Sequence, residues 1–518
     1  MYLKPNSPAV GHHGKTVIGF NWIGGKEAEG DLPSFDARSA VDSRDTVGIF
    51  PECGERDVDR AARAAAAALA AWGAAPARER GAAVGRIGEV LAARQESVAA
   101  VITREVGRPP REALDEVREI VALCRAWADP ARFQAAAERR TRPLGVCAVL
   151  AGGAAPLAAP AWKVLGALVC GGTVVWKPSV HAPTTAYLLV RCMMDAGLAP
   201  GVVNVVNGRG RGECGRAMLA GIARGLFQKV CFSGSQTAGR VVAEQAGRAL
   251  VPVSLELGGR SPMLVMPDAD LGRAVAEALR AAFRGAGQGR AALGNILVHR
   301  DVALPFREAF LAGVQALTSG NPVTDPEVAC GPMINPRCAR VFIDHFSRGR
   351  EDGARLLCGG DAWSEDNRTP QVRGAIAKGS YMQPCVWDEV TPEMEIFRAE
   401  LPGPTVNLSP VDSFDQALAW ANACPHAAVA TLLSGSAGWI ARFRRDCNAA
   451  ALRVNAGEDG WSGSGDSERS PGWETGYTRW QEASGAPLPE PAAGPGMERG
   501  AYEATNWDGL EGGARQLQ

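Results

Sequence analysis

The chain has 518 residues, of which 46% are hydrophobic and 21% are charged, and its formal net charge is −1. This length and composition allow two or three domains with hydrophobic cores. The near-zero charge gives no global field that would favour nucleic acid or an anionic membrane. No uninterrupted apolar run reaches about 18 residues, so the sequence predicts no transmembrane helix.

Thirteen cysteines are scattered along the chain without a Cys-x-x-Cys pair. This spacing predicts buried thiols in a reducing compartment, not a disulfide framework or a metal site. The first fifteen residues lack the apolar segment of a secretory signal. We therefore expect a cytoplasmic protein that holds no metal.

The first 130 residues read as short strands followed by helices. Residues 17–25 and 31–50 alternate apolar and turn residues, which is typical of short strands. An alanine-rich run follows Asp57, which we expect to act as its N-cap. The apolar spacing predicts helices over 60–72, 78–105 and 111–128.

Strands and helices then alternate at short intervals, which indicates βαβ units and a largely parallel sheet. The expected strands are 145–151, 172–177, 201–207 and 229–235, and the expected helices are 156–168, 184–196 and 236–246. After residue 257 the alternation begins again in a second α/β domain. There we expect helices over 268–284, 305–318 and 415–423, strands over 295–299 and 428–434, and loops over 348–384. The tail, 481–518, has little apolar periodicity, so we expect it to be irregular or disordered.

Five segments resemble motifs of the aldehyde dehydrogenase superfamily. They read WKVLGALVCGGTVVWKPS (162–179), AGLAPGVVNVVNG (196–208), FSGSQTAGR (232–240), LELGGRSPMLVMPDADL (255–271) and ELPGP (400–404). Their order and spacing extend the resemblance over about residues 20 to 477. The resemblance implies an α/β fold with a Rossmann-type dinucleotide-binding domain (1–130 and 146–256), a catalytic-type α/β domain (257–455) and a small oligomerisation element (131–145 and 456–480).

The resemblance also implies a site for NAD or NADP. Lys177, at the end of a strand, resembles the lysine that hydrogen-bonds the adenosine ribose. Gly234 and Ser235 resemble the turn that, with the following helix N-terminus, contacts the pyrophosphate. Leu257 is a further cofactor contact, and Glu400 resembles the glutamate that holds the nicotinamide ribose.

Two substitutions alter this cofactor half. Pro402 stands where the family motif has phenylalanine. Val180 stands where many relatives have a glutamate that faces the adenosine ribose. Because losing that carboxylate removes a repulsion against a 2′-phosphate, the sequence leaves NAD and NADP both open.

The catalytic half departs further from the family pattern. Glu256 resembles the general base, but Arg290, 34 residues later, stands at the position of the nucleophilic cysteine. A guanidinium remains protonated and has no lone pair with which to attack a carbonyl. Ala154 replaces the asparagine whose amide donates to the oxyanion, and Gly285 stands where the nucleophile loop often has asparagine.

Several interpretations of these residues remain open. Cys231 and Cys330 lie outside the nucleophile loop, so we expect them to be structural. We expect Glu256 and Arg290 to form an ion pair. Alternatively, Arg290 captures a carboxylate or phosphate ligand, or points outward.

Three functions follow from this pattern. The first is a pseudoenzyme that keeps a dinucleotide site and acts as a partner or regulatory subunit. It would form a homo-oligomer, or a hetero-oligomer with an active relative, and would accept a small aldehyde or carboxylate ligand. The alternative is an active NAD(P)-dependent oxidoreductase that acts on an aldehyde, carbonyl or imine by a non-covalent route. The third is a structural protein without a cofactor.

Overall fold

The structure is a computed structural model that describes residues 15–129, 141–400, 403–455 and 478–480. The predicted tail 481–518, most of the predicted oligomerisation element and Pro402 lie outside these ranges. Within the described residues, no helix is both long enough and apolar enough to cross a membrane.

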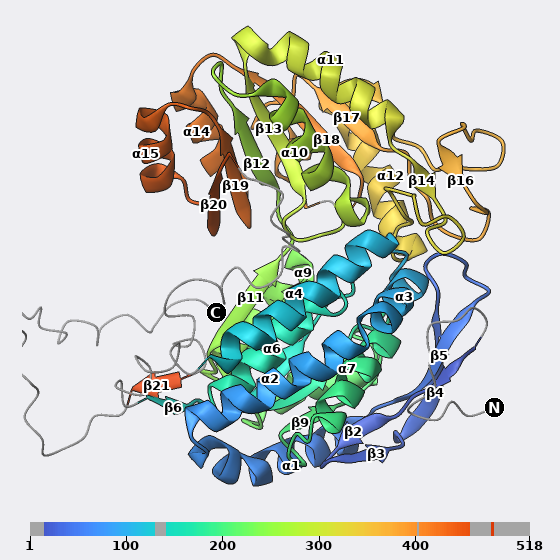
Figure 1. Ribbon diagram of the computed structural model, residues 1–518, viewed down its shortest axis with the longest axis vertical. Coiled ribbons are helices and arrows are strands. Elements are labelled where there is room, and N and C mark those ends of the chain that lie inside the picture. Colours follow the sequence, from blue (N-terminus) through green and yellow to red (C-terminus); the bar gives the residue numbers. More distant parts are fainter. Residues whose placement is uncertain (1–14, 130–140, 401–402, 456–477, 481–518) are drawn as a thin grey trace, which may run out of the picture. The chain divides into compact units, whose positions relative to one another are not determined.

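The first half of the chain forms a seven-stranded sheet in the order β11-β10-β7-β8-β9-β2-β3 (Figure 1). Its strands are β2 (Asn21–Ile23), β3 (Lys26–Ala28), β7 (Val146–Leu150), β8 (Thr173–Lys177), β9 (Val203–Val205), β10 (Lys229–Gly234) and β11 (Val253–Leu257). The strands from β11 to β9 run parallel. The chain leaves β7 toward β8 and β9, and β10 then pairs with the opposite side of β7. This reversal places a crevice at the carboxyl ends of β7 and β10, where ligands bind in open α/β sheets.

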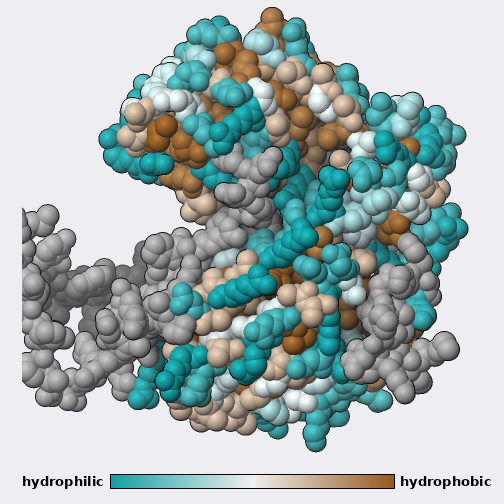
Figure 2. Space-filling view, in the orientation of Figure 1, coloured by the Kyte–Doolittle hydropathy of each residue, from teal (hydrophilic) through white to brown (hydrophobic). Residues whose placement is uncertain are grey.

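Helices cover both faces of this sheet. They are α1 (Glu55–Ala74), α2 (Ala77–Ala93), α3 (Gln95–Val106), α4 (Pro110–Ala128), α6 (Ala158–Val169), α7 (Pro183–Asp195), α8 (Glu213–Ala223) and α9 (Gln236–Arg248). Alternate residues of β7 enter opposite cores: Cys147 and Val149 pack with α2, α4, α6 and α7, whereas Ala148 and Leu150 pack with α1, α8 and α9. This alternation is the period of two that a β-strand imposes. The outer face of α4 is hydrophilic, as Figure 2 shows.

Two local predictions in this half are wrong. Gly54, not Asp57, is the N-cap of α1, and the Asp57 carboxylate accepts the Gly54 N–H at 3.2 Å from the third helical position. The helix predicted over 78–105 is broken at Arg94, which has a φ of −116° and separates α2 from α3. Periodicity continues across such a break because both helices bury one apolar face.

The second half forms another seven-stranded sheet in the order β15-β17-β18-β13-β12-β19-β20. Only the pairing of β15 with β17 is antiparallel among those described for this sheet. Its strands are β12 (Ser261–Val265), β13 (Leu293–His299), β15 (Arg355–Cys358), β17 (Cys385–Asp388), β18 (Thr405–Val411), β19 (Val429–Leu433) and β20 (Ala451–Val454). Its helices are α10 (Leu271–Phe283), α11 (Arg300–Ala316), α12 (Pro336–Glu351), α13 (Glu395–Arg398), α14 (Phe414–Asn422) and α15 (Ala437–Asp446).

Two predictions fail here as well. The segment expected as loops, 348–384, contains the end of α12, the strand β15 and the short strand β16 (Val372–Arg373), which pairs with β14 (Ser319–Gly320). The helix expected to start at Pro305 starts at Arg300, where the His299 ring accepts the Asp301 N–H at 3.3 Å. The proline is therefore inside α11, although proline usually marks a helix start.

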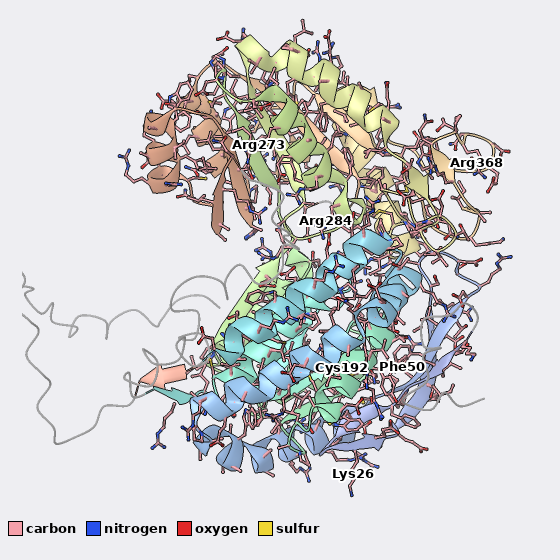
Figure 3. The ribbon with its side chains drawn as sticks, in the orientation of Figure 1. Lys26, Phe50, Cys192, Arg273, Arg284 and Arg368 are labelled. Atoms are coloured by element: carbon pink, nitrogen blue, oxygen red, sulfur yellow. The ribbon has the colours of Figure 1, made fainter. Side chains whose placement is uncertain are left out.

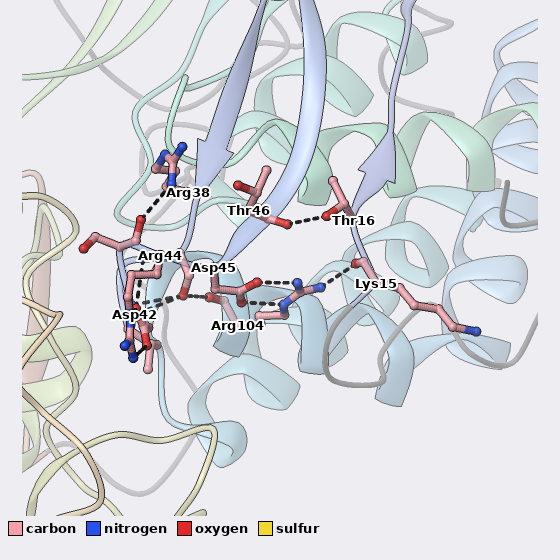
Figure 4. Close-up of polar contacts among 11 residues, drawn as sticks. Lys15, Thr16, Arg38, Asp42, Arg44, Asp45, Thr46 and Arg104 are labelled. Atoms are coloured by element: carbon pink, nitrogen blue, oxygen red, sulfur yellow. Dashed lines mark hydrogen bonds and ion pairs between the residues drawn. The ribbon is translucent and has the colours of Figure 1, made fainter. Parts of the chain in front are cut away.

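Besides the β14-β16 pair, the described residues form two further small sheets. The sheet β1-β5-β4 consists of β1 (Val17–Ile18), β4 (Leu32–Arg38) and β5 (Thr46–Glu52). The Arg104 guanidinium of α3 holds this sheet, because it donates to the Asp45 carboxylate at 2.6 and 2.8 Å and to the Lys15 carbonyl at 2.8 Å (Figure 4). Strands β6 (Thr141–Pro143) and β21 (Thr478–Trp480) pair antiparallel. The domain boundaries expected from the sequence remain a prediction.

Candidate active site

Glu256 lies on β11, beside Ser233 of β10, and its side chain is 4% exposed. The fully buried ammonium of Lys163, on α6, forms an ion pair with Glu256 Oε2. Arg290 Nη2 lies 3.9 Å from Glu256 Oε1. The expected ion pair between Glu256 and Arg290 is therefore confirmed, but the closer partner is Lys163.

Sequence reasoning did not assign a role to Lys163, although a signal was present. Lys163 is the one charged residue of α6, AAPAWKVLGALV, whose residues are all buried. A lysine is almost never fully buried unless it is paired, so this position itself predicts a buried carboxylate partner.

The pairing limits what Glu256 can do. Both of its carboxylate oxygens face a cation, Lys163 at Oε2 and Arg290 at Oε1. A carboxylate must turn away from such partners before it can accept a proton from a water or a substrate. These two ion pairs therefore oppose base catalysis by Glu256 in this arrangement.

The buried ion pair of Arg108 with Glu116 fixes the loop that carries Ala154. Arg108 donates through one nitrogen to the Ala154 carbonyl and through the other to Glu116 at 2.6 Å. The second oxygen of Glu116 accepts the N–H groups of Leu157 and Ala158 at 2.9 and 2.8 Å. This carboxylate therefore stabilises the N-terminus of α6 and fixes the position of the loop.

The loop that leads to Arg290 is also fixed by hydrogen bonds. Gly285 has a φ of +58°, and its N–H donates to Glu112 at 2.8 Å. The Gln288 amide donates to the Gly285 carbonyl at 3.1 Å and accepts the Ile334 N–H at 2.8 Å. Burial raises the pKa of Glu112, and Arg108 opposes that shift. Arg284, labelled in Figure 3, begins this loop.

A small pocket that is partly open to solvent lies between these two loops. Ala154 and Gly285 both line it, together with Arg108 and Gln288.

Lys177 ends β8 with its side chain buried. Its ammonium donates to the carbonyls of Pro178 and Gly208, the latter at 3.1 Å. Burial lowers the pKa of Lys177. Val180 packs beside the cluster of Phe35 and Phe50, so it presents an apolar side chain at this position.

Gly234 and Ser235 connect β10 to α9. The Ser235 hydroxyl caps α9 by accepting the Ala238 N–H at 3.4 Å. The Gly234 carbonyl accepts the Gly258 N–H at 3.2 Å. The Leu257 side chain packs against Gly239 so closely that a Cβ there would overlap it. The predicted cofactor residues Gly234, Ser235 and Leu257 therefore lie close together at the carboxyl end of β10.

Glu400 lies at the N-terminus of α9. Its Oε2 accepts the N–H of Gln236, the first residue of that helix, at 2.9 Å. Its Oε1 lies against Gly258, where any Cβ would overlap it. Burial raises the pKa of Glu400, while the Gln236 N–H and His426 act in the opposite direction.

Arg260 holds the segment that carries Glu400, and sequence reasoning missed it. Its buried guanidinium donates to the carbonyls of Ala399 at 3.1 Å and Ile396 at 3.0 Å. It also lies 3.0 Å from Nε2 of His345. Burial lowers the pKa of Arg260 to about 10, and burial together with Arg260 lowers the pKa of His345 to about 2. His345 is therefore neutral, and its Nε2 accepts the hydrogen bond.

Comparison with known proteins identifies the family of this chain. The model of the aldehyde dehydrogenase family matches residues 28–467. An α-ketoglutaric semialdehyde dehydrogenase from Bacillus subtilis is 31% identical over 455 residues, which cover 85% of this chain and 89% of that protein.

Solved structures give the same result. An NAD-dependent aldehyde dehydrogenase from Sinorhizobium meliloti aligns with a TM-score of 0.80 at 25% identity and covers 95% of this chain and 99% of its own. An NADP dependent enzyme from E. coli aligns with a TM-score of 0.76 at 27% identity and covers 85% of this chain and 90% of its own. With a family match over most of the sequence and an α/β fold shared with these structures, the chain belongs to the aldehyde dehydrogenase family.

Proposed function

We propose that this chain binds NAD or NADP but does not carry out thioester chemistry, and that it acts as a partner or regulatory subunit. The observation that carries this proposal is the cluster at Glu256. Arg290 occupies the position that the family resemblance gives to the nucleophile, and it faces the carboxylate that would serve as base. No cysteine lies between residues 285 and 295.

The residues around α9 and β8 fit a dinucleotide. The N-terminus of α9 already binds an anion, because the Gln236 N–H donates to the Glu400 carboxylate. The same N–H groups are oriented to bind a pyrophosphate. Lys177 ends β8 at the same edge of the sheet. The names of the relatives from Sinorhizobium meliloti and E. coli, one NAD-dependent and one NADP dependent, support a nicotinamide dinucleotide without choosing between the two.

The names of the relatives favour a second candidate, an active oxidoreductase. The relative from Bacillus subtilis is a semialdehyde dehydrogenase. Without a thiol, an aldehyde hydrate would have to lose a hydride from carbon to the oxidised dinucleotide and a proton from oxygen to a base, and so become a carboxylic acid. Glu256 would be that base only after leaving Lys163 or Arg290.

Turnover separates the two candidates. For a pseudoenzyme, purified protein forms no NADH or NADPH from a panel of aliphatic, aromatic and carboxylated aldehydes, and it forms a hetero-oligomer when co-expressed with a thiol-bearing relative. Steady turnover by the chain alone would favour the oxidoreductase.

We predict that an aldehyde reagent directed at active-site cysteines leaves no adduct within residues 285–295. The reason is that Arg290 supplies no nucleophilic lone pair. Peptide mass spectrometry after incubation checks this result. An acyl group found on that peptide would contradict the absence of covalent chemistry.

We predict that Lys177→Ala weakens dinucleotide binding roughly tenfold or more, because it removes a charge-assisted hydrogen bond worth about 1.5–3 kcal/mol. Calorimetric titration with NAD and with NADP measures the effect. Lys26→Ala, at an exposed lysine of β3, is the matched control and should leave affinity unchanged. Absence of binding by the unmodified chain at millimolar dinucleotide would instead favour a purely structural protein.

A further inference from the structure

The Glu400 carboxylate occupies the helix N-terminus to which the resemblance assigns the pyrophosphate. The Gln236 N–H that it accepts, at 2.9 Å, is the first N–H of α9 and one of the groups that would bind phosphate. Two anions cannot share this hydrogen-bond donor at such a distance without strong repulsion. Glu400 and a pyrophosphate are therefore alternatives at this position.

Neighbouring residues stabilise the contact between the Glu400 carboxylate and the Gln236 N–H. Gly258 has no side chain, and the Oε1 of Glu400 fills the place that a Cβ would take. The Gln236 side chain donates to the Gly258 carbonyl at 3.0 Å, which fixes this glycine relative to the helix. On the other side, Arg260 binds the Ala399 carbonyl and so holds the backbone next to Glu400.

We propose that Glu400 is an internal plug of the dinucleotide site, which must leave the N-terminus of α9 before the pyrophosphate can bind. This inference rests on the proposed function, because it takes the α9 turn as the dinucleotide site. The plug reduces the apparent affinity for the dinucleotide, because the intrinsic affinity is multiplied by the fraction of molecules in which the site is open. It also gives Glu400 a role in the closed state that differs from the contact with the nicotinamide ribose expected from the sequence.

ADP is the probe that isolates this effect, because it carries a diphosphate but no nicotinamide ribose. In Glu400→Ala the helix N-terminus is vacant, so ADP should bind about tenfold more tightly than it does to the unmodified chain, for a plug that is closed in roughly nine of ten molecules. Adenosine, which lacks phosphate, should bind both proteins equally. Titration calorimetry gives both affinities without any turnover.

Two further variants serve as controls. Glu393→Ala removes an exposed carboxylate from the same segment and should leave ADP affinity unchanged. Glu400→Gln keeps the shape of the side chain and removes its charge, so its affinity for ADP should fall between those of the unmodified chain and Glu400→Ala. Circular dichroism confirms that each variant is folded.

Equal or weaker ADP binding by Glu400→Ala would overturn the plug, as would an equal gain for adenosine. The proposed function would survive that result if NAD or NADP still bound in a manner dependent on Lys177. If neither dinucleotide nor ADP bound the unmodified chain or Glu400→Ala, the plug and the dinucleotide site would both be wrong.

Discussion

Replacing Lys163 by methionine is expected to destabilise the folded protein by about 3–5 kcal/mol, because it leaves the buried Glu256 carboxylate without its closest cation. Methionine fits the apolar surroundings in α6, so the loss of stability reports the charge and not a cavity. Arg290, 3.9 Å from the other oxygen, offsets part of this cost. Denaturant unfolding measures the shift in midpoint.

Two comparisons make this expectation specific. Arg290→Met removes the more distant and more exposed partner of Glu256, so it should cost less stability than Lys163→Met. Lys26→Met removes an exposed lysine and should have no measurable effect (Figure 3). If Arg290→Met destabilised the protein more than Lys163→Met, the assignment of Lys163 as the main partner of Glu256 would be wrong.

The alternating strands and helices of the fold were predicted well, because each of them has a local pattern of apolar and turn residues. The buried parallel strands β7 and β8 appear as short apolar runs that end at turn residues. The errors lie where tertiary packing overrides local signals. The break at Arg94 follows from the packing of α2 and α3 on α4, which no local residue pattern marks.

The candidate site shows the same division. Glu256, Lys177, Gly234, Ser235 and Glu400 were predicted because motifs carry them, and their roles stay predictions. The residues that fix their positions were missed, because Arg108, Lys163 and Arg260 act on partners 46 to 139 positions away along the chain. A single sequence does not pair such residues, although a lone charge in an apolar helix, as at Lys163, indicates that a partner exists.

Arg290→Cys alone is expected to give little aldehyde oxidation. A thiol with an ordinary pKa near 8.5 is only a few per cent thiolate at neutral pH. Glu256 would lose one cation but keep its ion pair with Lys163, so it would still be held away from a substrate water. The oxyanion would also lack the side-chain amide that Ala154 does not supply, a loss that typically costs about 10²–10³-fold in rate.

The double variant Arg290→Cys with Ala154→Asn should exceed the product of the two single variants. Thiol and amide act as one unit, so neither contributes fully without the other. Ala154 and Gly285 line the same small pocket, so the new asparagine would stand beside the loop that carries residue 290. Formation of NADH from small aliphatic and aromatic aldehydes is the assay, with Ala154→Asn alone as the matched control. High activity from Arg290→Cys alone would show that another donor already serves the oxyanion. An inactive double variant that still binds dinucleotide would show that the site has diverged from the family at residues beyond 154 and 290.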